Sequence, residues 1–262
     1  MSESVFERVG GAWAPTAHAR GPWDPHAQHG GAPAALLARE IEWTEPGTDM
    51  TVARITYEFL GPVPLRPLTA VARVTRPGRR LQLVEAELRD GGRAVVRARA
   101  VRLRRGAVEL PADARTDEPV PCPGPEQSQS APFPTDGPAE GFHRSAMEIR
   151  FAAGTAYGGG PAYAWFRFAR PLVAGEEPSP LQLAAAAADF GNGVSSILDF
   201  GEHLFVNTDL TLHLAREPAG DWVLLDARTL IEAHGAGLAF SRLFDLRGPI
   251  GLAAQSLYVE PR

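Results

Sequence analysis

The stretch RLQLVEAELRDGGRAVVRARAVRL, residues 80–103, alternates apolar with polar or charged side chains on both sides of a turn at Asp90-Gly91-Gly92. That alternation is typical of two half-buried antiparallel strands joined by a tight turn. A second stretch, LAFSRLFDLRGPIGLAAQSLYV at residues 238–259, repeats the pattern with its turn in the middle. The pair predicts an internal duplication, with the alternative that two unrelated strand hairpins look alike.

Outward from these hairpins, each half of the chain shows the same order of one helix followed by four strands. We expect helices at residues 30–43 and at 180 to about 190, where Ala and Leu predominate. The expected strands cover residues 51–62, 68–78, 80–92, 93–105, 204–220, 222–237, 238–248 and 250–261. The fold class is therefore α+β, with two tandem repeats in which an antiparallel sheet accompanies a helix.

Between the halves, residues 106–140 are rich in Pro, Gly and acidic residues and lack apolar periodicity. Such composition is typical of a linker. We therefore expect a first lobe at residues 1–105, a linker at 106–140 and a second lobe at 141–262. Two lobes of this size can each bury a hydrophobic core.

Composition excludes several classes of protein. The formal net charge of −5 argues against a nucleic-acid partner, because phosphate binding depends on clustered Lys and Arg. One cysteine, Cys122, allows no disulfide within the chain, so the cytoplasm is the expected compartment. The residues at the start lack the pattern of a signal peptide, and no apolar run is long enough to insert into a membrane.

Chemistry is suggested by the segment LQLAAAAADFGNG, residues 181–193, where five alanines end at Asp189. Small side chains let a helix lie close to a sheet. A carboxylate at such a helix end opposes the helix dipole and, if buried, needs partners. Asp189 is therefore a candidate catalytic base, with a role in the following turn as the alternative. Gln255 shares a face with Ala253 and Leu257, so its amide also needs a buried partner.

Four segments resemble the acyl-CoA thioesterase II family, which has the double hot-dog fold with each sheet wrapped around a central helix. These segments are HGGAPAALLARE at 29–40, AAAADFGNG at 185–193, LFVNTDLTLHL at 204–214 and GLAAQSLYVEP at 251–261. The resemblance implies that Asp189 and Gln255 activate a water molecule. The family's third group is a hydroxyl two positions before an Asp. Here that position holds Asn207, with Thr208 as the neighbouring hydroxyl, and a solvent-facing Asn207 is the alternative.

The resemblance also implies an acyl-CoA substrate, and a homodimer or larger homo-oligomer as the assembly. We expect His29, Gly30 and Gly31 to bind the substrate, although the two glycines also suit a plain helix start. In the first half the position of Gln255 falls near Arg99. The arginines of this strand meet either coenzyme A phosphates or solvent, and they are Arg97, Arg99, Arg102 and Arg104.

No metal or cofactor is expected, because the seven histidines lack metal-ligand spacing and the chain has neither a G-x-S-x-G nucleophile motif nor a phosphate-binding loop. The sequence therefore predicts an acyl-CoA thioesterase that acts through Asp- and Gln-activated water. Two alternatives stay open. One is a hot-dog dehydratase acting on acyl thioesters, and the other is a protein that binds acyl-CoA or an acyl carrier without turnover.

Overall fold

The structure is a computed structural model that describes residues 3–45, 49–114, 118–130, 138–156 and 159–262. It contains two lobes. The first lobe comprises α1 (Gly31–Trp43), β1 (Phe6–Val9), β2 (Ala12–Pro15), β3 (Met50–Phe59), β4 (Thr69–Arg76), β5 (Leu81–Asp90) and β6 (Arg93–Arg104). The second lobe comprises α2 (Pro180–Ala188), α3 (Gly191–Ser195), β8 (Met147–Ala153), β9 (Ala162–Phe168), β10 (His203–Asn207), β11 (Asp209–Leu214), β12 (Val223–Ile231), β13 (Ala236–Asp245) and β14 (Gly248–Pro261).

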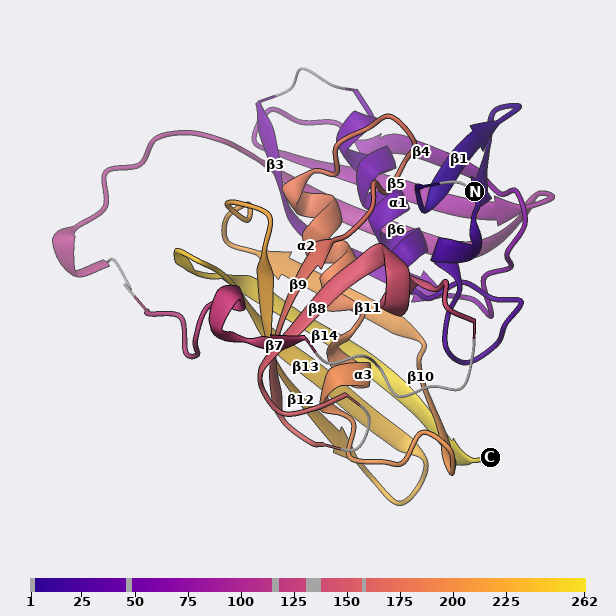
Figure 1. Cartoon of the computed structure of the whole chain (residues 1–262). Helices are drawn as coiled ribbons and strands as arrows, with labels where there is room; N and C mark the ends of the chain where they lie inside the picture. The colour runs from indigo at the N-terminus through magenta and orange to yellow at the C-terminus, as the bar shows by residue number, and fades with distance from the viewer. Residues whose placement is uncertain (1–2, 46–48, 115–117, 131–137, 157–158) are drawn as a thin grey trace.

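One antiparallel sheet runs through both lobes. Its strand order is β4-β5-β6-β3-β11-β14-β13-β12-β9-β8-β7, where β7 is Gln129–Ser130 and β10 pairs with β14. The lobes join where β3 pairs with β11. Figure 1 shows the two helices side by side near the centre, with the strands of each lobe around them. Helix α1 packs on β3–β6 and helix α2 on β9, β11 and β12. This confirms the expected α+β architecture of two repeats, each a sheet wrapped around a central helix.

The two helices run antiparallel and lie unusually close. A Cβ placed on Gly31, at the start of α1, would lie 2.8 Å from the Ala186 carbonyl oxygen near the end of α2. All five alanines of α2 are buried, so small side chains do bring this helix against its neighbours. The start of each helix therefore lies beside the end of the other helix. The two pairs of helix ends formed in this way carry different side chains.

Strand register shows that the hairpin β5–β6 of the first lobe and the hairpin β13–β14 of the second lobe are equivalent. In the first lobe Val84 pairs with Ala100, and in the second Ala239 pairs with Gln255, each at the same distance from its hairpin turn. The position equivalent to Gln255 is therefore the buried Ala100. The expectation of Arg99 was wrong by one residue, and in a strand one residue changes the face.

Two regions differ from the sequence-based expectation. Strands β8 and β9 complete the second lobe although only four strands were expected after α2. Part of the expected linker is also ordered, since β7 (Gln129–Ser130) pairs with β8 and the Trp165 indole N–H donates to the Pro123 carbonyl oxygen at 2.9 Å. Val120 and Cys122 pack against a hydrophobic cluster formed by Trp165, Trp222, Leu224 and Phe244. Apolar residues in a Pro-rich segment thus have packing partners that composition does not reveal.

None of the helices in the described ranges has both the length and the apolar character needed to cross a lipid bilayer.

Candidate active site

Asp189 lies at the carboxyl end of α2 and is buried, and side-chain amides reach it from two strands. The Asn207 Nδ2 group donates to Asp189 Oδ1 at 2.8 Å. The Gln255 Nε2 group donates to the Asp189 backbone oxygen at 3.1 Å and contacts Oδ1 at 3.4 Å. A buried carboxylate needs such donors, and the helix contributes none because its free groups at this end are carbonyls. The structure thus brings together the three polar residues singled out in the sequence.

The inward position of Asn207 results from a β-bulge at Thr208. Asn207 pairs with Leu257 on β14, whereas Thr211 pairs with Ala254, so the chain between them holds one extra residue. A bulge of this kind reverses the alternation of faces. Asp209 consequently faces outward and accepts from the Ser256 backbone N–H at 2.6 Å, while Asn207 faces Asp189. Strict alternation in the sequence predicts that Asn207 and Asp209 share a face, and the bulge makes this prediction wrong.

Thr208 itself is exposed, and its hydroxyl donates to the Ser256 backbone oxygen at 3.4 Å. It lies on the side of the strand away from Asp189, which leaves Asn207 as the residue that contacts the carboxylate at this position. An amide donor thus stands where the family pattern has a hydroxyl donor.

The first lobe contributes the residues before α1. His29 Nδ1 lies 3.0 Å from Asp189 Oδ2 and 3.1 Å from the Gly31 backbone nitrogen. A protonated Nδ1 donates to the carboxylate, whereas an unprotonated Nδ1 accepts the Gly31 N–H. Next to His29, a Cβ on Gly30 would lie 2.8 Å from both oxygens of Asp189, so glycine is needed for the carboxylate to sit here.

His29 and Gly30 therefore contact the carboxylate directly, in addition to any contact with substrate. Gly31 is buried against Ala186 and Phe142, which favours close helix packing as the reason for this glycine. The His29 ring stacks on Phe190, with ring centroids 4.3 Å apart. His143 lies next in this stack. Its pKa is lowered to about 3, mainly by burial and to a smaller extent by the nearby charges of His29 and Arg144.

A cavity of about 60 Å³ lies beside the carboxylate, between residues of both lobes. Its lining residues are Pro22, Trp23, Gln28, His29, Gly30, Asp189, Phe190, Asn192, Gly193 and Asn207. At roughly 10–15 Å³ per water, this volume holds a few water molecules. Sequence reasoning missed Gln28 and Asn192. The Gly191-Asn192-Gly193 motif, less than one helical turn after Asp189, was the available signal for Asn192.

The opposite ends of the two helices carry a different arrangement. The Arg102 guanidinium donates to the Ile41 carbonyl oxygen and, at 2.9 Å, to the Thr44 carbonyl oxygen, and so caps the end of α1. Nearby, the Ser179 hydroxyl donates to the Glu42 carboxylate at 2.7 Å. Burial raises the pKa of Glu42 despite the hydrogen bonds from Ser179 and Gln182. These contacts satisfy the helix ends with side chains.

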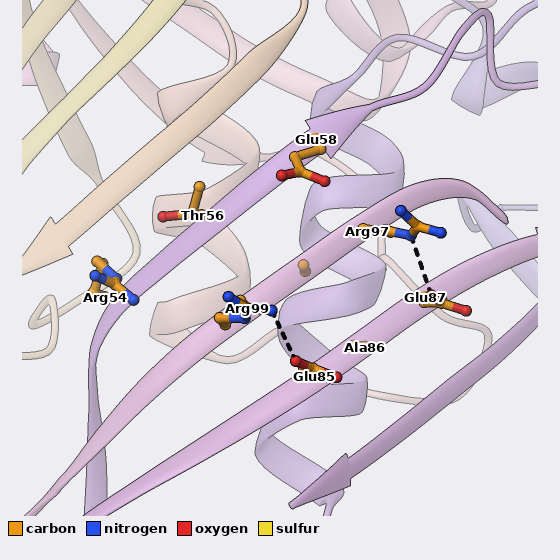
Figure 2. Close-up of a pocket in the computed structure, with 9 residues that line it drawn as sticks. Arg54, Thr56, Glu58, Glu85, Ala86, Glu87, Arg97 and Arg99 are labelled. Carbon is orange, nitrogen blue, oxygen red and sulfur yellow. Dashed lines mark hydrogen bonds and ion pairs between the residues drawn. The ribbon is translucent and has the colours of Figure 1, made fainter. Parts of the chain in front are cut away.

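The other arginines of β6 face away from the site. Figure 2 shows Arg97 and Arg99 on the outer face of the sheet, where they pair with Glu87 and Glu85. These side chains line a hollow of about 520 Å³. Arg54 and Glu58 also line this hollow. Because carboxylates already pair with these guanidinium groups, a solvated strand face accounts for Arg97 and Arg99 better than binding of coenzyme A phosphates does.

Known structures share this architecture over almost the whole chain. A protein of unknown function with a hot-dog fold from Alicyclobacillus acidocaldarius is 17% identical, with a TM-score of 0.73 over 97% of this chain and 95% of that one. The tesB protein of Mycobacterium avium subspecies paratuberculosis is 17% identical, with a TM-score of 0.65 and coverage of 98% and 96%. The acyl-CoA thioesterase II TesB2 from Mycobacterium marinum is 14% identical, with a TM-score of 0.63 and coverage of 91% of both chains.

The sheet, the antiparallel helix pair and these matches define a double hot-dog protein. Residues 19–103 match the acyl-CoA thioesterase N-terminal domain, and residues 125–259 match the acyl-CoA thioesterase C-terminal domain. The chain therefore belongs to the acyl-CoA thioesterase family, whose members are thioester hydrolases. No curated protein sequence matches the chain.

Proposed function

We propose that this protein hydrolyses an acyl-CoA to the free acid and coenzyme A, with Asp189 as the general base. The observation that carries the proposal is the buried Asp189 carboxylate, held by Asn207 and Gln255 beside a cavity. Among the described residues, His29 is the polar group that contacts Asp189 Oδ2, so this oxygen retains a lone pair for a water proton. A positioned carboxylate of this kind supplies general-base catalysis.

In the proposed reaction, Asp189 takes one proton from a water molecule while the water oxygen attacks the thioester carbonyl carbon. The tetrahedral intermediate then collapses, the carbon–sulfur bond breaks, and coenzyme A leaves as a thiolate that takes up a proton. Asn207 and Gln255 fix the orientation of the carboxylate. His29 Nδ1, at 3.0 Å from Oδ2, is placed to accept the proton that Asp189 gains.

Release of free thiol from short, medium and long acyl-CoAs tests the proposal, with native protein compared with Asp189→Asn. The amide keeps the shape of the side chain but cannot accept the proton, so we expect kcat to fall by about 10³-fold. Glu42→Gln is the matched control, because Glu42 is the buried carboxylate near the opposite ends of the helices. Its kcat should stay within about twofold of native. Equal activity in native protein and Asp189→Asn would refute the mechanism.

A dehydratase acting on acyl thioesters remains the second candidate, because His29 and Asp189 form the histidine–acid pair that such chemistry requires. An assay for hydration of an enoyl-CoA, measured as the loss of its ultraviolet absorbance, distinguishes the two reactions. A protein that binds acyl-CoA without releasing thiol or hydrating the enoyl group would instead support a binding role.

We also keep homo-oligomer formation as a proposal. Exposed apolar side chains lie on the outer face of the second-lobe sheet, where the first lobe has paired charges, and they are Leu230, Leu238, Phe240, Leu252 and Tyr258. Light scattering at several protein concentrations gives the assembly size. The lobe boundaries at residues 105 and 141 and the cytoplasmic location likewise stay predictions.

A further inference from the structure

Asn192 is a buried residue of the cavity whose side chain has one unsatisfied hydrogen-bonding atom. It lies in α3, three residues after Asp189, and is 5% exposed. Its Nδ2 group donates to the Phe205 carbonyl oxygen at 3.0 Å, which fixes the orientation of the amide. Among the described residues no group donates to its Oδ1 atom, although that atom is shielded from solvent.

Asn192 is also connected to the catalytic set. Its backbone N–H donates to Gln255 Oε1 at 3.2 Å, and the Nε2 group of the same Gln255 contacts Asp189. Gln28 has a second unsatisfied oxygen, Oε1, in the lining of this cavity. The Gln28 amide, however, is tied to the Pro64 carbonyl oxygen in the first lobe at 2.9 Å and has no contact with Gln255 among the described residues.

A buried acceptor without a donor is rare and usually indicates an ordered water or a ligand group. An attacking water offers two protons, of which Asp189 accepts one. The amide donors of Asn207 and Gln255 are already directed to Asp189. What the water still needs is a neutral acceptor that holds its second proton without removing it.

We propose that Asn192 Oδ1 is this acceptor, so that Asn192 and Asp189 together orient the attacking water. Asn192 is then a further catalytic residue, in contact with a reacting molecule. The inference rests on the proposed hydrolysis and extends it to a residue outside the set that the sequence indicated.

The test compares thiol release by native protein, Asn192→Ala and Ser195→Ala. Ser195 is the matched control, because it is equally buried in α3 and bonds the Gly191 oxygen and the Thr229 hydroxyl. For Asn192→Ala we expect kcat to fall by about 30-fold with KM within twofold of native, since misplacing the nucleophile affects the reaction step. For Ser195→Ala we expect a lower melting temperature and a kcat close to native.

A kcat for Asn192→Ala no lower than that of Ser195→Ala, or a change confined to KM, would overturn the inference. Absence of thiol release by the native protein is a separate result, which refutes the proposed function. A high-resolution crystal structure of the native protein then decides the inference without activity, and it also serves if Asn192→Ala does not fold. We expect one ordered water within hydrogen-bonding distance of both Asn192 Oδ1 and the Asp189 carboxylate. Absence of this water from the crystal structure would overturn the inference.

Discussion

The two lobes have the same backbone at the positions that form the site, but different side chains. In both lobes the strand that follows the helices carries a bulge at the same place, at Ala53 in β3 and at Thr208 between β10 and β11. The inward residue before the bulge is Val52 in the first lobe and Asn207 in the second. The comparison teaches that both repeats have the backbone geometry of the site, whereas only the second carries the polar side chains.

The same contrast holds on the last strand of each lobe. Counted from the hairpin turns, Ala100 corresponds to Gln255 and Arg102 to Leu257. In the first lobe a guanidinium closes the helix end, whereas in the second an amide leads to a carboxylate. Exchanging residues between the lobes tests whether the arginine-capped end serves stability and the end with the carboxylate serves the proposed catalysis.

Among exchanges between the lobes, the largest effect should follow from Gln255→Ala, which gives the second lobe the residue of the first. The substitution removes a donor to Asp189 and an acceptor for the Asn192 N–H, so we expect kcat to fall by about 10²-fold, or about 2.7 kcal/mol of barrier. Thiol-release kinetics measure this loss. Ser256→Ala, one residue away on the outer face, should leave kcat within twofold. An active Gln255→Ala variant would mean that the lobes differ without consequence for catalysis.

The next effect is on stability and comes from Arg102→Leu, which gives the first lobe the residue found at Leu257. Loss of the hydrogen bonds to the Ile41 and Thr44 carbonyls should lower the free energy of unfolding by about 2 kcal/mol, with kcat unchanged. Urea denaturation measures the change. The control is Arg99→Leu, which removes only an exposed ion pair and should cost less than about 1 kcal/mol. Similar losses in both variants would refute the capping role.

A third effect concerns pH. Burial lowers the pKa of His143 to about 3, below the usual value near 6.5, so between these values the unfolded chain binds the extra proton. Stability is therefore complete above about pH 6.5 and falls as pH drops toward 3, by up to about 1.4 kcal/mol per pH unit. Urea denaturation between pH 7 and pH 4 should show a weaker pH dependence for His143→Leu. His213→Gln, which changes an exposed histidine, should behave as native.

The sequence was sufficient for the features that depend on local periodicity. Alternating side chains located β5, β6, β13 and β14, and the alanine run located α2 and its terminal Asp189. Strict alternation placed Asn207 and Asp209 on one face, because a bulge adds a residue without changing the local pattern. The equivalent of Gln255 was misjudged by one residue at the hairpin turns, where the sequences DGGR and DLRG align only through the strand register. The contact between His29 and Asp189 joins two helices from different lobes, and only their antiparallel packing brings those residues together.

The bulge at Thr208 also bears on how the chain is compared with its relatives. An alignment that absorbs this extra residue anywhere else along β10 or β11 assigns Asn207 the wrong counterpart and makes an inward residue look like a surface one. Deletion of Thr208 alone would restore regular alternation, with Asn207 still directed to Asp189 and Asp209 still facing outward. The bulge therefore changes the length of the chain without changing which residues face the site.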